Sequence, residues 1–243
     1  MNSIDALSQA GPIATLTLPS PLNARAVAVL GDACLAVAED AQVRVLIVRA
    51  EPACWRGWPD DLVPLLAEQG LIGDPFGPLA AVPQPTIAVV QGDVFDAGLE
   101  LALCADVRIA QAGARFSLPA VARGVFPGAG GLQRLSRAVG RSRATQLLLT
   151  GPIAAAAARD WGLVSDLADD PAAAAAALAA RIAERGPIAT RLAKEAVARG
   201  LEMPLDQALR YETDLTVLLQ STDDRAEGVR AFLEKRPPDF RGG

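Results

Sequence analysis

Residues Pro85 to Ala110 read PTIAVVQGDVFDAGLELALCADVRIA and carry the clearest structural pattern in the chain. The apolar run 86–90 is typical of a buried strand, and Gln91-Gly92 predicts that this strand ends in a turn. Apolar residues then recur at four-residue spacing, which predicts a helix that begins near Asp96. The residues that give this spacing are Leu99, Leu103 and Val107.

Two carboxylates, Asp96 and Glu100, lie one helical turn apart at the start of this predicted helix. The first N–H groups of a helix have no partner within the helix and carry partial positive charge, so they suit an oxygen atom with negative charge. The two acids would share a face beside such a site. The alternative is structural, with Asp96 as the helix cap and Glu100 as a first-turn acid favoured by the helix dipole.

The composition narrows the class of protein. A chain of 243 residues is long enough to bury a large core, and the formal net charge of -5 argues against a general nucleic-acid binder. Histidine is absent, which excludes Ser-His-Asp and Cys-His catalysis and removes the commonest metal ligand. Because Cys34, Cys54 and Cys104 are widely spaced with no CxxC pair, we expect buried free thiols and no metal site.

The sequence shows no targeting or membrane signal. Its first residues lack a basic region followed by an apolar core, and no unbroken apolar run reaches about 18 residues. We therefore expect a cytoplasmic protein with no membrane partner and no nucleic-acid partner.

Short strands alternate with helices through the first part of the chain, and only helices follow. The predicted strands are 13–18, 43–48, 86–90, 114–118 and 162–167, with a further edge segment at 108–110. The predicted helices are 25–39, capped by Asn23, then 132–139, 142–149, 172–185, 188–199, 205–219 and 223–235. We expect an α/β core over residues 1–169 and an all-helical region over 170–243.

Three local features add detail to this pattern. The apolar face of the helix 25–39 is predicted to be Val27, Leu30, Cys34, Leu35 and Ala38. Trp55 and Trp58 share a loop, where they either plug the edge of the core or wall a pocket. The segment 128–131, Gly-Ala-Gly-Gly, lacks the GxxxxGK[ST] of a phosphate loop, so a tight turn that admits close backbone approach is the better interpretation.

An ordered set of segments resembles the enoyl-CoA hydratase/isomerase family, the crotonases. The segments are Pro21-Leu-Asn-Ala24, Val82-Pro-Gln-Pro-Thr-Ile-Ala-Val-Val-Gln-Gly92, Glu100-Leu-Ala with Asp106-Val-Arg-Ile-Ala110, Phe116-Ser-Leu-Pro119, Pro127-Gly-Ala-Gly-Gly-Leu-Gln-Arg-Leu135, and Glu227-Gly with Ala231-Phe-Leu-Glu-Lys-Arg236. The match covers nearly the whole chain, and its most specific part is 127–135. The resemblance implies a spiral of ββα units and a C-terminal helical region that builds trimers, often paired into hexamers.

The resemblance also implies an acyl-CoA thioester substrate and no cofactor beyond the CoA of that substrate. Two backbone N–H groups would hold the thioester oxygen, and on this chain these donors would be Trp58, which follows Gly57, and Ala97. Abstraction at Cα, addition at Cβ and decarboxylation all place negative charge on that oxygen. Losing one such donor typically costs about 3 to 4 kcal/mol of transition-state stabilisation.

The chain departs from the family pattern at its two donor loops. The first loop, Arg56-Gly-Trp-Pro-Asp-Asp-Leu62, carries extra residues and a bulky donor. The glycine-rich turn of the family is Asp96-Ala97-Gly98 here, which narrows the expected site and adds a carboxylate.

A third departure concerns the catalytic acids. Hydratases of the family use two glutamates, of which one aligns with Glu100 and the other with Ala120. Water addition needs a group that deprotonates water and a proton source for Cα. Asp96, Asp60 or Asp61 could supply the missing carboxylate.

We therefore expect a divergent hydratase that binds an acyl-CoA and uses Glu100 as base or water-orienting group. The nearest enzymatic alternatives are a decarboxylase and a thioester hydrolase, because an enolate made by loss of CO2 needs the oxyanion donors more than it needs two acids. The resemblance also includes isomerases, which depend on the same position that is Ala120 here. Two alternatives lack catalysis, namely a CoA-ester-binding protein and a purely structural trimeric subunit.

The resemblance suggests which residues bind CoA. Phe232 and Lys235, from the tail of a neighbouring subunit, would lie near its nucleotide and phosphates. Further candidates are Arg25, Arg56, Gly57 and Gly98. Arg56 or Arg123 could instead pair with Asp60 or with an acidic acyl group, since arginine binds carboxylates with two parallel hydrogen bonds.

Overall fold

The computed structural model describes residues 6–56 and 74–243. Its strands are β1 (Leu7–Ala10), β2 (Ile13–Leu18), β3 (Val45–Ala50), β4 (Thr86–Val90), β5 (Val94–Phe95), β6 (Val107–Gln111), β7 (Arg115–Ser117), β8 (Ile153–Ala154) and β9 (Asp166–Ala168). Its α-helices are α2 (Ala24–Glu39), α4 (Gly77–Ala81), α5 (Ala97–Ala102), α6 (Gly131–Val139), α7 (Arg141–Thr150), α8 (Ala155–Asp160), α9 (Pro171–Ala183), α10 (Pro187–Gly200), α11 (Leu205–Gln220) and α12 (Asp223–Glu234). Two short 3₁₀ helices are η1 (Pro52–Trp55) and η2 (Pro119–Arg123).

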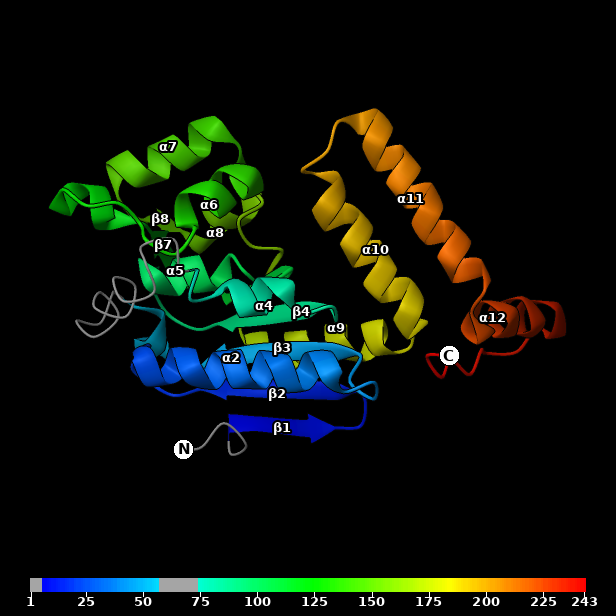
Figure 1. Cartoon of the computed structure of the whole chain (residues 1–243). Coiled ribbons are helices and arrows are strands. Elements are labelled where there is room, and N and C mark those ends of the chain that lie inside the picture. Colours follow the sequence, from blue (N-terminus) through cyan, green and yellow to red (C-terminus); the bar gives the residue numbers. More distant parts are fainter. Residues whose placement is uncertain (1–5, 57–73) are drawn as a thin grey trace.

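The main sheet has the strand order β1-β2-β3-β4-β6-β9 within the described residues. β1 pairs antiparallel with β2, and every later neighbour in the sheet is parallel. Parallel neighbours need a crossover between them, and α2 and α5 lie in two of these connections. In Figure 1, α2 lies in front of the strands of this sheet, and α4 to α7 lie above them.

Both faces of this sheet are covered by helices, because its strands place apolar side chains on alternate sides. One face, represented by Leu16 and Val48, faces the main core with α2. The other face, represented by Ile47 and Val89, packs against α9. The first helix of the predicted all-helical region 170–243 therefore covers the sheet.

The helix α2 confirms the predicted cap, since the Asn23 side chain accepts a hydrogen bond of 3.0 Å from the Ala26 N–H. Its apolar face is rotated from the predicted one. Leu30 and Cys34 are buried as expected, but Leu35 is 61% exposed. The residues buried on this face are Ala26, Val29, Leu30, Ala33, Cys34 and Val37.

The helix α5 is shorter than predicted. It begins after Asp96 as expected but ends at Ala102, and Val107 begins the strand β6. Asp106 explains the break, because its carboxylate accepts hydrogen bonds from the N–H and hydroxyl of Thr86, at 2.8 and 2.9 Å. These bonds fix the entry into β6 beside β4, so strand pairing overrides the four-residue apolar spacing.

Three predicted strands need correction, and the first, 43–48, is shifted by two residues to β3. The segment 108–110 was expected at a sheet edge, but β6 is paired on both sides, with β4 and with β9. The predicted strand 162–167 narrows to β9, because Gly162 and the following residues form turns after α8. The short elements that were not predicted are β1, β5, β8, α4, α8, η1 and η2.

A smaller sheet, β5-β7-β8, lies between the main sheet and the helices α6 and α7. β5 leads directly into α5, and β7 leads directly into η2. The pairing of Phe95 with Ser117 joins these two strands at the end where both helices begin. This sheet therefore holds the first turns of α5 and η2 side by side.

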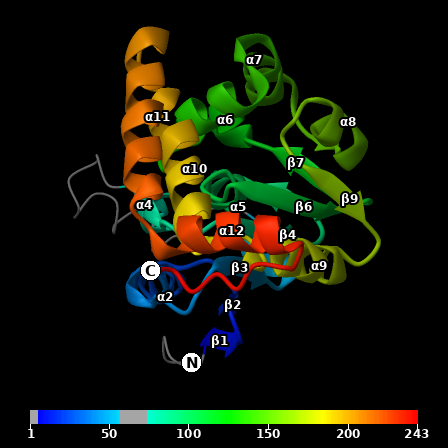
Figure 2. The same ribbon diagram turned by 90° about the vertical axis from the view of Figure 1, so that its right-hand side faces the viewer.

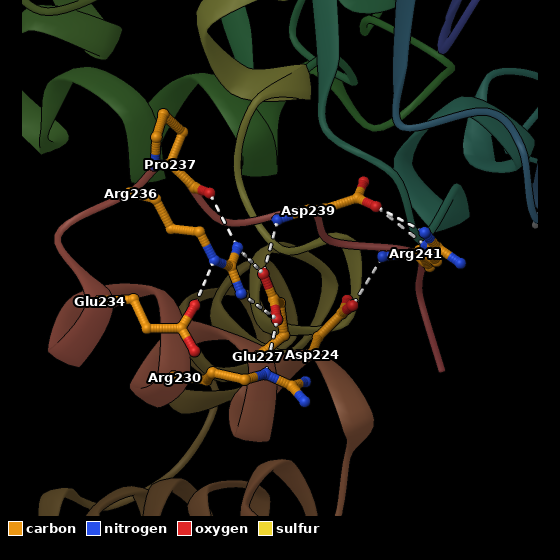
Figure 3. Close-up of polar contacts among 8 residues, drawn as sticks. All are labelled: Asp224, Glu227, Arg230, Glu234, Arg236, Pro237, Asp239 and Arg241. Atoms are coloured by element: carbon orange, nitrogen blue, oxygen red, sulfur yellow. Dashed lines mark hydrogen bonds and ion pairs between the residues drawn. The ribbon is translucent and has the colours of Figure 1, made fainter.

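The last three helices lie to one side of the sheet, and α10 contacts its edge through the ion pair of Lys194 with Asp106 (2.6 Å). α10 and α11 form an antiparallel pair beside the α6 and α7 layer, and α12 crosses below them (Figures 1 and 2). Residues 236–243 then fold back along α12 in a polar network (Figure 3). Among the described helices, none has both the length and the apolar character needed to cross a membrane.

Candidate active site

Glu100 lies at the centre of the candidate site and is fully buried. Its Oε1 accepts hydrogen bonds from the backbone N–H groups of Ala129 (3.0 Å) and Gly131 (2.9 Å). A Cβ atom at position 131 would lie 2.6 Å from Cγ and from Oε1 of Glu100. The segment 128–131 is thus a tight turn that brings two backbone donors onto a carboxylate.

The pKa of Glu100 is raised to about 7. Burial is the largest cause, and the nearby negative charge of Asp96 adds to it. The hydrogen bonds from Ala129 and Gly131 oppose the rise because they stabilise the charged form. Oε2 has no hydrogen-bond partner among the described residues, so one oxygen is fixed and the other is available.

Asp96 occupies the position before α5 but does not cap the helix with its side chain. Its backbone has φ 49° and ψ -122°, a conformation that favours glycine and costs about 1–3 kcal/mol for other residues. Its N–H donates to the Ser117 carbonyl at 3.1 Å. The Asp96 side chain therefore does not accept a hydrogen bond from the first turn of α5, as the side chain of an N-cap residue normally does.

The Asp96 side chain is 6% exposed and forms an ion pair with Arg123, with 3.0 Å between Oδ2 and Nη2. Its other oxygen, Oδ1, is buried and has no partner in the part of the chain that the structure describes. Buried polar atoms are almost always hydrogen-bonded. Asp96 Oδ1 and Glu100 Oε2 both lack a described partner, and their residues are one helical turn apart. These two oxygens therefore indicate a place for a polar ligand or water.

The Ala97 N–H is the first donor of α5, and it has no acceptor within residues 6–56 and 74–243. The next residue, Gly98, packs against η1 so closely that a Cβ atom there would lie 2.2 Å from the Trp55 carbonyl oxygen. This contact explains why position 98 is glycine, and the explanation does not require that Gly98 binds a ligand. Trp55 is fully buried, so it plugs the core, as one of the two interpretations expected.

Ala120 is buried in η2, at the position where the resemblance implied the second glutamate of a hydratase. Asp60 and Asp61, the other candidate replacements, lie outside the described residues, as do Gly57 and Trp58. Asp96 is therefore the candidate replacement that the structure describes.

Arg134 supports the turn that holds Glu100. Its Nη1 donates to the Ala129 carbonyl at 2.9 Å, and its guanidinium also forms an ion pair with Asp74. Arg134 was not singled out in the sequence, although it belongs to the motif 127–135.

The residues expected to contact CoA are dispersed in the single chain. Arg56 pairs with Asp93 at 2.9 Å and is half-exposed. Arg25 is exposed in the first turn of α2. Phe232 is 82% exposed on α12, and Lys235 follows the end of that helix. In Figure 1, α12 lies on the opposite side of the molecule from α5. One chain does not bring these last two residues to Glu100, and their CoA contacts stay a prediction that needs a neighbouring subunit.

The titratable groups outside this site show little sign of chemistry. The three cysteines are free and buried, and burial raises the pKa of each to about 12. In the described part of the chain, no group of three or more His, Cys, Asp or Glu side chains is arranged to hold a metal ion.

Comparison with known proteins agrees with this arrangement of fold and acidic site. The model of the enoyl-CoA hydratase/isomerase family matches residues 72–243. The chain is 46% identical over 167 residues to 2,3-dehydroadipyl-CoA hydratase of Escherichia coli strain K12, a match that spans 68% of this chain and 66% of that enzyme. It is 39% identical over 173 residues to (E)-benzylidenesuccinyl-CoA hydratase of Thauera aromatica, spanning 70% of this chain and 68% of the relative.

The crystal structure of an enoyl-CoA hydratase from Bacillus anthracis superimposes with a TM-score of 0.86 and 30% identity, covering 98% of this chain and all of that one. The fold is therefore the crotonase fold, as the resemblance implied. This chain belongs to the enoyl-CoA hydratase/isomerase family and is an acyl-CoA enzyme of that family.

Proposed function

We propose that this protein hydrates an enoyl-CoA thioester, with Glu100 as the residue that deprotonates the attacking water. The observation that carries the proposal is the buried Glu100 carboxyl, with Oε1 held by two N–H groups and Oε2 without a described partner. A general base works best when its pKa is near the operating pH, and the pKa of Glu100 is about 7.

The reaction also needs a place for the charge that develops on the thioester oxygen. The Ala97 N–H, three residues before Glu100, is the described donor that suits this role, with Trp58 as the expected second donor. As the water oxygen bonds to Cβ, Glu100 takes a proton and the thioester oxygen becomes negative. A protonated carboxyl group then returns a proton to Cα, which restores the thioester.

Asp96 is proposed as the second carboxylate of the site, in place of the glutamate that Ala120 replaces. Its Oδ1 is buried without a described partner, and its charge is close enough to raise the pKa of Glu100. A water between the two carboxylates could satisfy Asp96 Oδ1 and Glu100 Oε2 together.

The proposed substrate is an acyl-CoA, and a panel of thioesters would identify its acyl group. The test panel should include 2,3-dehydroadipyl-CoA and (E)-benzylidenesuccinyl-CoA, the thioesters named for two relatives.

We also propose a homotrimer or a dimer of trimers, supported by large apolar side chains that are exposed on α10 to α12, such as Leu205 and Phe232. Light scattering after gel filtration tests this assembly, and a monomeric mass would contradict it.

The decisive experiment measures products by mass spectrometry for wild type, Glu100→Gln and a control, Glu184→Gln. Glu184 is exposed at the end of α9, so its variant should keep full activity. We expect a 3-hydroxyacyl product from wild type and a loss of at least about 100-fold in kcat/KM for Glu100→Gln. The wild-type kcat/KM should rise with pH through about 7, since the base must be deprotonated.

The same assay separates the alternatives. A free acid would assign thioester hydrolysis, and loss of CO2 from a malonyl-type thioester would assign decarboxylation, which Ala120 favours because that reaction needs only the oxyanion donors. Unchanged turnover in Glu100→Gln would remove Glu100 from the mechanism.

A further inference from the structure

The 3₁₀ helix η2 places Arg123 where it can act on Asp96. Three residues complete one turn of a 3₁₀ helix, so Ala120 and Arg123 project from the same side of η2. Ala120 is a small buried residue, and Arg123 extends beyond it to the Asp96 carboxylate, with 3.0 Å between Nη2 and Oδ2. An acid and an arginine thus lie together beside the position where the family places one glutamate.

The Asp96 carboxylate depends on this arginine. Among the described residues, Arg123 is the ionic partner of this carboxylate, while the Asp96 backbone N–H donates separately to the Ser117 carbonyl. A buried carboxylate requires a partner to remain charged at low cost. The interaction engages Oδ2 and leaves Oδ1 unpartnered, so Arg123 determines which Asp96 oxygen is available for water.

We infer that Arg123 is a positioning residue for hydration, which holds Asp96 so that the Asp96–Arg123 pair replaces the second catalytic glutamate. This inference rests on the proposed function. Arg123 does not touch the reacting atoms, and its effect on the reaction passes through Asp96.

The groups that surround the two acids define the electrostatic test. Glu100 interacts with Asp96 on its own helix, with the backbone donors of the 128–131 turn, with Arg134 on α6 and with the thiol of Cys104. Arg123 on η2 is the cation that pairs with Asp96. The negative charge of Asp96 raises the pKa of Glu100, so we expect removal of the Arg123 charge to raise that pKa further as long as Asp96 stays charged.

The matched control is Arg115. It is about as exposed as Arg123, with side chains 56% and 50% exposed, and it also pairs with a nearly buried aspartate, Asp93. It belongs to β7 and its partner is not Asp96. Arg115→Gln therefore removes an ion pair of similar exposure that does not include Asp96, and Asp93 keeps its ion pair with Arg56.

The experiment compares Arg123→Gln, Arg123→Lys and Arg115→Gln in the full chain, with steady-state kinetics, pH profiles and thermal unfolding. We expect Arg123→Gln to lower kcat by at least about tenfold, with a much smaller change in KM. Its kcat/KM profile should shift to higher pH, Arg123→Lys should recover part of kcat, and Arg115→Gln should resemble wild type. A lower melting temperature for Arg123→Gln with unchanged kcat and pH profile would show a structural tether and overturn the inference.

A double-mutant cycle tests whether Arg123 acts through Asp96. We expect Asp96→Asn/Arg123→Gln to be no slower than Asp96→Asn alone, since a positioning residue has nothing to position once the carboxylate is gone. Fully additive losses would overturn the inference while leaving hydration intact. If wild type forms no hydrated product, the proposed function fails, and the role of Arg123 fails with it.

Discussion

Glu100 shows how the fold sets the chemistry of one carboxyl group. Burial alone would drive the pKa of the carboxyl well above its ordinary value, and the two N–H groups of the 128–131 turn limit that rise. The result, a pKa of about 7, keeps both protonation states accessible near neutral pH. An acid that must accept and then return a proton benefits from this balance.

The same balance predicts how stability depends on pH. The pKa of Glu100 is raised from 4.5 to about 7 in the folded protein, so the folded state binds more protons than the unfolded state between these values. Stability is therefore lost as pH rises through this window, by up to about 3 kcal/mol. Glu100→Gln cannot titrate and should avoid this loss.

Urea unfolding from pH 4 to pH 8 measures the difference. The free energy of unfolding of Glu100→Gln should increase relative to that of wild type as pH rises, and reach a plateau above about pH 7. Parallel curves for the two proteins would show that the buried carboxyl is not destabilised by ionisation.

At the level of elements, α5 is fixed by two close backbone approaches, with η1 on one side and the turn before α6 on the other. Gly98 faces the Trp55 carbonyl, and Gly131 faces the Glu100 side chain. Together these contacts determine where Glu100 and the Ala97 N–H lie relative to each other. The glycines were visible in the sequence, but the partners they approach were not.

Gly98→Ala tests the contact with η1. Alanine normally stabilises a helix relative to glycine, but here its Cβ would lie 2.2 Å from the Trp55 carbonyl oxygen. We expect a loss of about 1–3 kcal/mol in the free energy of unfolding. The matched control is Gly31→Ala in α2, where the added Cβ would have no neighbouring atom within 4 Å. This variant should gain about 0.5–1 kcal/mol in the free energy of unfolding. The same sign for both variants would contradict the contact.

The sequence predicts elements well where local signals suffice. The apolar run 86–90, the Asn23 cap and the four C-terminal helices depend on neighbouring residues, and the structure confirms them. The end of α5 could not be predicted, because it depends on Asp106 bonding Thr86, twenty residues away. Likewise, Glu100 was found from its motif, whereas the Asp96–Arg123 pair arises only when β5 and β7 bring α5 and η2 together.

Across the whole molecule, residues 236–243 tie the last helix to the rest of the chain. Glu227 accepts hydrogen bonds from Arg236 and from the Asp239 N–H, and Asp224 accepts one from the Arg241 N–H (Figure 3). Asp224 also accepts hydrogen bonds from the Gly242 N–H. The Phe240 carbonyl accepts a hydrogen bond from Arg44, the residue before β3. This segment therefore links α12 to the sheet through backbone groups. It also helps to set where Phe232 lies.

Deleting residues 240–243 tests that link. The Asp224 carboxylate is 5% exposed, so losing the N–H donors of residues 241 and 242 should destabilise the protein by about 1–3 kcal/mol. Hydrogen exchange should increase in α12, while the amides of β3 and β4 keep their protection. Arg241→Ala is the matched control, since its side chain is 84% exposed and pairs with Asp239 while its N–H is retained. If that variant loosens α12 as much as the deletion does, the exposed ion pair holds the helix and the backbone donors do not.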